Sequence, residues 1–397
     1  MTRSRMLFAL AALAVGALGA CTPTNVLTVP RVVALGGGYN AHCAVYNTGG
    51  VWCWGAQLGA GTSSANPVKV TGLPFPASKI TDDGGPNSHI CVLVQPGQPY
   101  CWGSNNHGQL GPGFGGSQSA TPVAVPDLVG ATDIAAGGGH TCAVFAIGTM
   151  KCWGDNTFGQ LGNGTFVSSS SPVQVGDVGH FTQVVAGRDY TCGLTQDTTV
   201  FCWGSGPIGA IGVSPTGVDS PVAVQSPFLF NAPLTGVRYI SGGDSHVCAI
   251  LSAQLGASDG QVVCWGLGID GELGNGATVS QTLPVLATGM TGSFLVGAGQ
   301  SHSCATSSTF TMFNLTNQLV CWGRSPQNAK AASNTAPSGT SLLFVRQLHA
   351  GANSTCALVA KNDTSSTDVE CFGSGSQGQL GQNSPDTYTP IQVLGLP

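Results

Sequence analysis

The sequence predicts an all-β protein, a seven-bladed β-propeller of four-stranded blades with one disulfide inside each blade. Three observations lead to this prediction: seven consecutive cysteine pairs, a repeat of about 50 residues, and a Cys-Trp-Gly signature in nearly every repeat. The composition agrees, because 60 glycines and only 7% charged residues suit a chain of many turns. Long helices would carry more Glu and Lys on their exposed faces.

Residues 1–20 have the pattern of a lipoprotein signal peptide. Arg3 and Arg5 precede an uncharged run rich in Ala and Leu, which is too short to span a bilayer. The run ends at Cys21 in the sequence Leu-Gly-Ala-Cys, which resembles the bacterial lipobox, where the cysteine receives the lipid. An ordinary cleavable signal beside a cysteine is the alternative. We expect lipid attachment at Cys21, a tether over residues 21–30 and a propeller over residues 31–397.

This expectation includes the location of the protein. Thr22 follows Cys21. By resemblance to known lipoproteins, retention in an inner membrane would call for Asp at this position. We therefore predict an exported chain that is lipid-anchored to the cell envelope, at the outer membrane or the cell surface.

The cysteine count is odd, and lipidation of Cys21 explains the unpaired one. The other fourteen form seven pairs with nine intervening residues in the first four pairs and fourteen to sixteen in the last three. Each pair would lie opposite on an antiparallel hairpin, about 4.5 to 5.5 Å apart at Cα and so within disulfide range. Zinc ligation is the competing interpretation, but there is no C-x-x-C and no His at zinc-site spacing, so we predict no metal and no cofactor. The expected disulfides join Cys43 to Cys53, Cys91 to Cys101, Cys142 to Cys152, Cys192 to Cys202, Cys248 to Cys264, Cys304 to Cys321, and Cys356 to Cys371.

The repeat is visible in four segments of each unit. Counted from the first cysteine of each pair, the steps are 48, 51, 50, 56, 56 and 52 residues. In the third unit the four predicted strands fall near residues 131–137, 140–144, 150–154 and 172–175. Radial repetition leaves only short protected edges, whereas an open stack needs polar caps that the first and last units lack. The repeat therefore favours a closed propeller.

Four motifs of the repeat carry a resemblance to a known family. The series G-x-x-H-x-C-A, C-W-G, G-Q-L-G-x-G and P-V-x-V resembles the repeat of RCC1, the regulator of chromosome condensation, whose family folds as a seven-bladed propeller. The resemblance covers residues 31–397. The G-Q-L-G element is shortened at residues 57–59, drifts at 209–212 and is lost around 325–331, and its clearest copies start at Gly108, Gly159, Gly271 and Gly378.

The function of the founding member does not fit this chain. That member is a nuclear exchange factor for a small GTPase on chromatin, and an exported chain meets neither partner. The net charge of −5 and the scattered twelve Lys and Arg residues also exclude nucleic acid as a partner. A secreted inhibitor of β-lactamase with the same propeller binds another protein through its loops, so the resemblance implies a binding role.

We predict a cell-surface or periplasm-facing, lipid-anchored scaffold that presents a loop face to a protein or glycan partner. The loops between the first and second strands should meet at one mouth of the central channel, with tips that differ between blades. Longer hairpin tips of blades five to seven, such as Phe310–Asn317, are the alternative surface. The candidate binding residues are Tyr39, Asn40, Asn87, Arg188, Asp189, Asp244, Gln300 and Asn353.

A hydrolase or lyase acting at the channel mouth is the alternative function. It would need two converging carboxylates, for which Asp82, Asp83, Asp189 and Asp244 are candidates. H-E-x-x-H and P-loop patterns are absent from the sequence, so we predict that the chain is not an enzyme.

Histidines stand two residues before the first cysteine in four units. A ring of metal-binding imidazoles is one interpretation, but Ala, Tyr and Ser fill this position in the other three units, so we expect a repeated hydrogen bond to a neighbouring loop. His42 is one residue out of register and should point to the opposite face of its strand. The four histidines are His89, His140, His246 and His302, and the three other positions hold Ala41, Tyr190 and Ser354.

Overall fold

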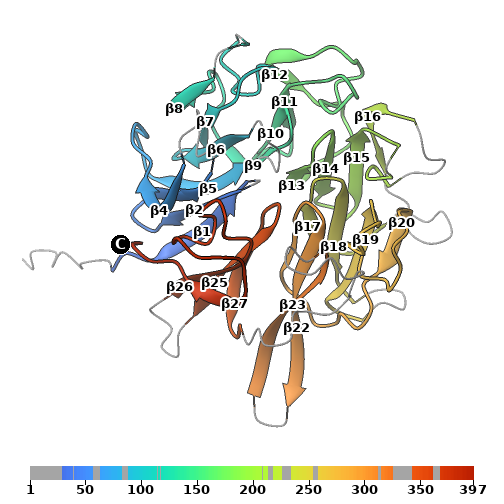
Figure 1. The fold of residues 1–397 in the computed structure, drawn as a ribbon. Coiled ribbons are helices and arrows are strands. Elements are labelled where there is room, and N and C mark those ends of the chain that lie inside the picture. Colours follow the sequence, from blue (N-terminus) through green and yellow to red (C-terminus); the bar gives the residue numbers. More distant parts are fainter. Residues whose placement is uncertain are drawn as a thin grey trace, which may run out of the picture.

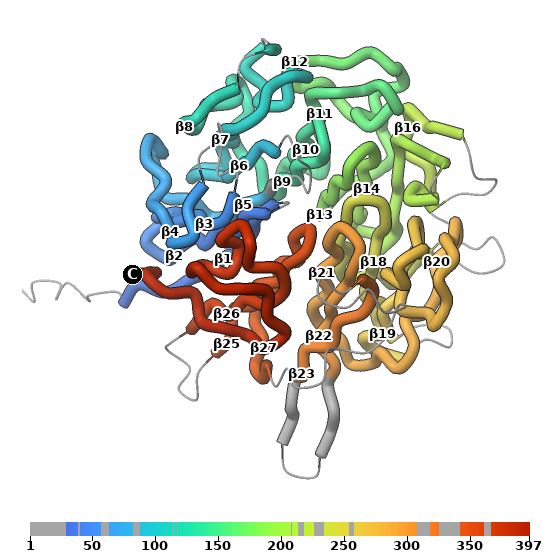
Figure 2. The backbone as a smooth tube through the Cα atoms, in the orientation of Figure 1, coloured from blue at the N-terminus to red at the C-terminus, as the bar shows by residue number. Residues whose placement is uncertain are grey.

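Seven β-sheets are arranged around a central axis (Figures 1 and 2). The computed structural model describes residues 29–38, 40–56, 63–82, 88–113, 115–116, 118–207, 209–212, 218–225, 234–253, 258–311, 314–324, 342–360 and 367–397. The predicted all-β, seven-bladed propeller is confirmed. In these residues no helix has the length and apolar character needed to cross a membrane.

The blades follow one another along the chain. Blade 1 comprises β1 (Val32–Gly37), β2 (Ala41–Tyr46), β3 (Val51–Gly55) and β4 (Ser64–Lys69); blade 2, β5 (Ala77–Asp82), β6 (His89–Val94), β7 (Gln98–Gly103) and β8 (Ser119–Ala124); blade 3, β9 (Ala131–Ala136), β10 (His140–Phe145), β11 (Met150–Gly154) and β12 (Ser169–Gln174). Blade 4 comprises β13 (Phe181–Ala186), β14 (Tyr190–Thr195), β15 (Val200–Gly204) and β16 (Ser220–Gln225); blade 5, β17 (Val237–Gly242), β18 (His246–Leu251), β19 (Gln261–Gly266) and β20 (Gln281–Leu286). Blade 6 comprises β21 (Val296–Ala298), β22 (His302–Thr311) and β23 (Asn314–Gly323); blade 7, β24 (Val345–Ala350), β25 (Ser354–Ala360), β26 (Thr367–Gly373) and β27 (Thr387–Gln392).

Each blade is an antiparallel sheet in chain order, with its first strand next to the axis. The second strand is the most deeply buried, and every residue of β2, β6, β14 and β18 is buried because both faces pack on neighbouring blades. Fourth strands such as β12 are partly exposed, since they form the outer rim. Six sheets have four strands, and the described part of blade 6 has three; residues 325–341, where its G-Q-L-G element is lost, lie outside the described residues.

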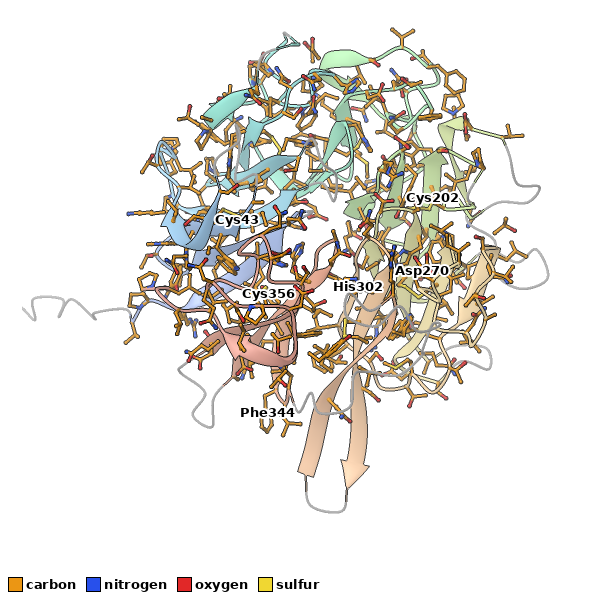
Figure 3. The ribbon with its side chains drawn as sticks, in the orientation of Figure 1. Cys43, Cys202, Asp270, His302, Phe344 and Cys356 are labelled. Carbon is orange, nitrogen blue, oxygen red and sulfur yellow. A yellow bond between two sulfur atoms is a disulfide. The ribbon has the colours of Figure 1, made fainter. Side chains whose placement is uncertain are left out.

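The seven cysteine pairs are joined within their own blades, as predicted. Their sulfur atoms lie 2.03 to 2.13 Å apart. The Cα atoms are 4.0 to 4.1 Å apart, closer than expected, because the cysteines directly oppose each other, as Cys142 and Cys152 do, and narrow positions of an antiparallel pair bring Cα atoms closest. Figure 3 labels Cys43, Cys202 and Cys356 in three different blades. Cys21 lies outside the described residues.

The core consists of seven apolar clusters, one between each pair of neighbouring blades. Every cluster combines the disulfide of one blade with the aromatic residue of the Cys-Trp-Gly or Cys-Phe-Gly motif in the next blade. Cys142 and Cys152, for example, share a cluster with Trp203. Trp54 of blade 1 packs in the same way with the disulfide of blade 7, so the ring closes by contact between two complete blades.

The two ends of the propeller differ in the connections they carry. The antiparallel order places the loops between first and second strands and between third and fourth strands at one end, which we call the loop end. The hairpins between second and third strands and the links between blades lie at the other end, the hairpin end. β1 begins and β27 finishes at the hairpin end.

Candidate functional site: the loop end

Backbone hydrogen bonds join the loops between first and second strands of blades 3 to 7 at the mouth of the channel. The amide of Arg188 donates to the carbonyl of Asp244 at 2.9 Å, that of Asp244 to Gly299 at 3.1 Å, and that of Gln300 to Gly351 at 3.2 Å. Glycine is required at this contact, because a Cβ on Gly299 would lie 2.3 Å from the Gly351 carbonyl oxygen. Backbone contacts therefore fix the mouth loops, and only their side chains vary between blades.

The channel behind this mouth is a cavity of about 210 Å³ lined by the first strands of all seven blades. Three of the candidate binding residues, Arg188, Asp244 and Gln300, line it. Asn40, Asp189 and Asn353 lie on the same loops but outside the lining, at intermediate exposure. Tyr39 and Asn87 lie outside the described residues. The structure thus brings together part of the predicted face.

An ion pair joins two adjacent blades at the mouth. The Arg188 guanidinium contacts the Asp244 carboxylate through Nε at 3.1 Å and Nη2 at 2.7 Å, and Ser245 donates a further hydrogen bond at 2.9 Å. The Asp244 side chain is 8% exposed and that of Arg188 is 55% exposed. The arginine is therefore the accessible member of a fixed, two-pronged pair.

The candidate catalytic carboxylates do not share the cavity. Asp244 lines it and is held by Arg188, whereas Asp189 lies outside its lining. Asp83 and the side chain of Asp82 lie outside the described residues. Burial raises the pKa of Asp189; Arg188 opposes this shift, and the negative charges of Asp155, Asp244 and Asp219 add to it. The carboxylates around Asp189 in blades 3 to 5 thus disfavour its ionisation.

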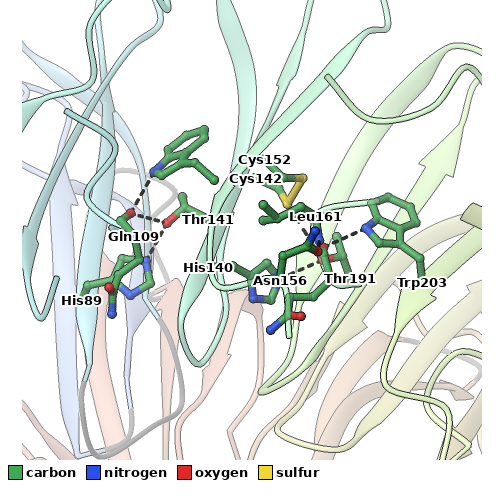
Figure 4. Close-up of a disulfide and its surroundings, with 12 residues drawn as sticks. His89, Gln109, His140, Thr141, Cys142, Cys152, Asn156, Leu161, Thr191 and Trp203 are labelled. Carbon is green, nitrogen blue, oxygen red and sulfur yellow. Dashed lines mark hydrogen bonds between the residues drawn. A yellow bond between two sulfur atoms is a disulfide. The ribbon is translucent and has the colours of Figure 1, made fainter. Parts of the chain in front are cut away.

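Behind the mouth, hydrogen-bond relays connect blade 2 to blade 3 and blade 3 to blade 4 (Figure 4). His140 Nε2 lies 2.8 Å from Thr191 Oγ1, which donates to the Gln160 carbonyl at 2.8 Å, and the Trp203 indole donates to the same carbonyl at 2.8 Å. The single hydroxyl proton is used on the carbonyl, so His140 must donate from a protonated Nε2. The relay thus joins two strands of blade 4 to the G-Q-L-G loop of blade 3.

The contact between a histidine and a hydroxyl group recurs at four junctions between blades. Where one member of this pair is replaced, the other is replaced as well. The expected repeated histidine hydrogen bond is present, but its partner lies on the second strand of the next blade and not on a loop, because that strand places a hydroxyl directly before its cysteine. Blade 4 has Tyr190 in the histidine position and blade 5 has Val247 in the hydroxyl position; there Tyr190 donates instead to backbone carbonyls. The pairs are His89 with Thr141, His140 with Thr191, His246 with Ser303, and His302 with Thr355.

The junction of blades 7 and 1 exchanges the two members of the pair. His42 Nε2 lies 2.8 Å from the Ser354 hydroxyl, so the histidine occupies the hydroxyl position and the serine the histidine position. The His42 side chain points toward the preceding blade, blade 7, whereas the other four histidines point toward the following blade. The one-residue shift of His42 predicted this opposite orientation. At the junction of blades 1 and 2 both members are replaced, by Ala41 and Ile90. This pairing is visible in the sequence only when the histidine position of one repeat is compared with the hydroxyl position of the next.

Burial lowers the pKa of five imidazoles. Desolvation lowers the pKa of His140 and His246 to about 3 and that of His302 and His349 to about 4, and the pKa of His42 falls well below its ordinary value for the same reason. Among the described residues, no three His, Cys, Asp or Glu side chains are grouped as metal ligands would be. Of these five, His42, His140, His246 and His302 act as neutral hydrogen-bond partners of hydroxyl groups.

Glu272 departs from the motif of the other blades. It occupies the position of Gln109, Gln160 and Gln379 and is fully buried. Its Oε2 accepts the Asp270 amide at 2.7 Å, while Oε1 has no hydrogen-bond partner. Burial raises the pKa of Glu272. Blade 5 thus carries an additional carboxyl in a loop where other blades carry an amide.

The family model described as "Regulator of chromosome condensation (RCC1) repeat" matches residues 96–144, 148–194 and 259–306, and a second model of this repeat matches residues 131–160. The human "Probable E3 ubiquitin-protein ligase HERC6" is 33% identical over 295 residues, which cover 72% of this chain and 22% of the relative. The chain therefore spans about a fifth of the length of HERC6.

Solved propellers share the fold. The crystal structure of human WBSCR16 superposes with a TM-score of 0.67 at 19% identity, over 83% of this chain and 88% of that one. Yeast RCC1 (Prp20), crystallised with Kap60, gives a TM-score of 0.65 at 18% identity, over 93% of this chain and 85% of that one. Both likenesses concern the fold alone. With the repeat matches and the seven sheets described above, the chain is a seven-bladed β-propeller that contains RCC1 repeats at residues 96–194 and 259–306.

Proposed function

We propose that this protein is an exported, lipid-anchored binding scaffold, without catalytic activity, that presents its loop end to a protein or glycan partner. The observation that carries the proposal is the set of mouth loops of blades 3 to 7, in which backbone hydrogen bonds join neighbouring blades while the side chains differ. A preformed surface of this kind loses little conformational entropy on binding. Such loops on a rigid frame are a common means of recognition.

The disulfides and the chain direction support the cellular setting of this proposal. Disulfides persist in oxidising compartments, and seven of them in one chain favour an exported location. β1 begins at the hairpin end, so a lipid on Cys21 would direct that end toward the membrane and leave the loop end facing outward.

The anchor is tested by replacing Cys21 with Ser. We expect Cys21→Ser to move the protein from the membrane fraction to the soluble fraction while the disulfides still form. Retention of the variant in the membrane fraction would contradict the anchor and leave the binding proposal untouched.

The binding proposal is tested by cross-linking the mature protein to the surface of its own cells and measuring the affinity of any captured protein or glycan. We expect Arg188→Ala with Asp244→Ala to weaken that binding at least tenfold. The matched control is Arg238→Ala with Asp259→Ala, because this pair is also an exposed ion pair, 3.0 Å apart, but lies at the hairpin end. Binding that is lost only in the control variant would overturn the proposal.

A further inference from the structure

Large apolar side chains are exposed along the loop end of three consecutive blades. Five of them lie in the loops between third and fourth strands, at 51% to 71% exposure. Three occupy the same position, two residues before the fourth strand, in blades 3, 4 and 5. We call this set the apolar arc; it comprises Phe166, Val167, Val218, Ile269 and Val279.

The arc continues from blade to blade because each loop packs on the next fourth strand. The amide of Gly164, two residues before Phe166, donates to the Pro221 carbonyl of blade 4 at 2.8 Å. In the same way, a Cβ on Gly209 of blade 4 would lie 3.1 Å from the side chain of Thr282 in blade 5. The exposed residues thus belong to one supported rim.

The loops that carry the arc are acidic. The loop-end segments of blades 3 to 5 (residues 154–168, 187–189, 204–219, 243–245 and 266–280) contain six acidic residues and one basic residue, Arg188. The acidic ones are Asp155, Asp189, Asp219, Asp244, Asp270 and Glu272, of which Glu272 is fully buried and does not belong to the surface. Figure 3 labels Asp270 on the fifth blade. Since Arg188 is already paired with Asp244, the other carboxylates lack a cationic side chain from these segments.

Asp155 keeps its negative charge although it is partly buried. Burial alone would raise the pKa of Asp155, but hydrogen bonds from Thr157 and Ser168 and the proximity of His107 more than offset it, so the pKa lies below its ordinary value. The carboxylate is therefore ionised at neutral pH. Its side chain remains 14% exposed beside the arc.

We infer that the apolar arc and the surrounding carboxylates form the docking surface for a basic protein segment, one that carries Lys or Arg among apolar side chains. This inference rests on the proposed binding function and assigns it to blades 3 to 5. Apolar contact would supply affinity, while the carboxylates would attract the cationic residues and repel acidic surfaces. An anionic membrane is excluded as the occupant by the same charge and by the position of the arc, which lies opposite the start of β1.

The experiment uses a phage library of random dodecapeptides selected on the mature protein. We expect the recovered peptides to be enriched in Lys or Arg together with Leu, Ile, Val or Phe. Their affinity should fall at least tenfold in Val167→Ser/Val218→Ser/Val279→Ser, about threefold in Asp219→Asn/Asp270→Asn, and with rising salt, because screening weakens attraction between exposed charges. The three valines are exposed and the two aspartates half-buried, so an unchanged melting temperature will verify that each variant folds.

The matched control is Phe75→Ser/Val129→Ser/Ile147→Ser, three residues that are 59% to 72% exposed at the hairpin end. This variant should bind the peptides like the original protein. Recovery of neutral or acidic peptides, recovery of none, or binding that survives the valine variant would overturn the inference. Peptides that depend on Arg188 and Asp244 alone would overturn it while supporting the proposed function, and peptides lost only in the control would contradict both.

Discussion

At the scale of single residues, the propeller is held by neutral hydrogen bonds repeated between blades. His140, Thr191 and the Gln160 carbonyl are fully buried together, so each group depends on the others for a partner. Leaving one buried polar group unpaired costs about 1 to 3 kcal/mol. The paired replacements at other junctions follow from this cost, because a histidine without its hydroxyl is unfavourable, whereas two apolar residues are tolerated.

A double-mutant cycle tests this dependence. We expect Thr191→Ile to lower the free energy of unfolding by about 1 to 3 kcal/mol, since it leaves His140 Nε2 without an acceptor. His140→Ala/Thr191→Ile, which copies the Ala41 and Ile90 pair of the first junction, should cost at least about 1 kcal/mol less than the sum of the two single changes. Additive costs, measured by urea unfolding, would show that the two side chains are independent.

The buried histidines also set a pH dependence. The pKa of His140 and His246 is about 3 in the folded chain, against 6.5 for an unperturbed histidine, so the unfolded chain binds these protons first. The resulting stability is complete above pH 6.5 and decreases as the pH falls from there toward 3. Each such histidine contributes about 1.4 kcal/mol per pH unit within that window.

We therefore expect the free energy of unfolding to fall steeply between pH 6.5 and pH 4.5, with an uptake of several protons on unfolding. Denaturant titrations at pH 7, 6 and 5 measure this slope. An uptake below one proton at pH 5.5 would contradict the prediction.

At the scale of elements, the hairpin of second and third strands is the repeated unit, and its disulfide serves two purposes. It closes a loop of about eleven residues, which in the entropy model stabilises the chain by roughly 3 kcal/mol. It also packs against the aromatic residue of the next blade, as Cys142 and Cys152 do with Trp203. The covalent link and the contact between blades therefore occupy the same place.

Removal of one disulfide should show both contributions. We expect Cys142→Ala/Cys152→Ala to lower the free energy of unfolding by about 3 kcal/mol or more, because the cavity beside Trp203 adds to the lost loop constraint. Calorimetry of the variant measures the change, and mass mapping of a non-reduced digest should find the other six pairs intact. A loss below about 1 kcal/mol, or disulfides between blades, would contradict this account.

At the scale of the whole molecule, the ring is closed without exchange of strands. Blade 1 and blade 7 are each formed by one continuous segment of the chain. Across their junction, the Gln347 side chain accepts a hydrogen bond from the Leu35 amide and donates one to the Val33 carbonyl. Gln183 makes the equivalent pair of contacts with Ile240 between blades 4 and 5. The closing interface is therefore built like the internal ones.

This equivalence predicts that the chain tolerates circular permutation. Joining Pro397 to Pro30 leaves seven residues between Gln392 and Val32, the same number that links Lys69 to Ala77. With new termini between Pro126 and Asp127, in an exposed link between blades 2 and 3, we expect a folded protein with all seven disulfides and a melting temperature within about 5 °C of the original. Failure of this permutant to fold would show that the last junction has a special role.

The sequence by itself determined the features that repeat. The cysteine spacing predicted seven hairpins, and the four motifs of each unit predicted the strands and the closed ring, because these features depend on residues within about 50 positions of one another. It also predicted the mouth loops, of which Arg188, Asp244 and Gln300 line the channel. Such local patterns can be recognised in the sequence because each blade folds from a continuous segment.

Only the tertiary structure decided which side chains of different blades contact one another. His42 and Ser354 are 312 positions apart and meet because the ring closes, and no periodicity within one unit shows that contact. The ion pair of Arg188 with Asp244 and the apolar arc over blades 3 to 5 likewise join residues from different repeats. Packing of neighbouring blades brings these side chains together, so the recognition surface is a property of the assembled ring.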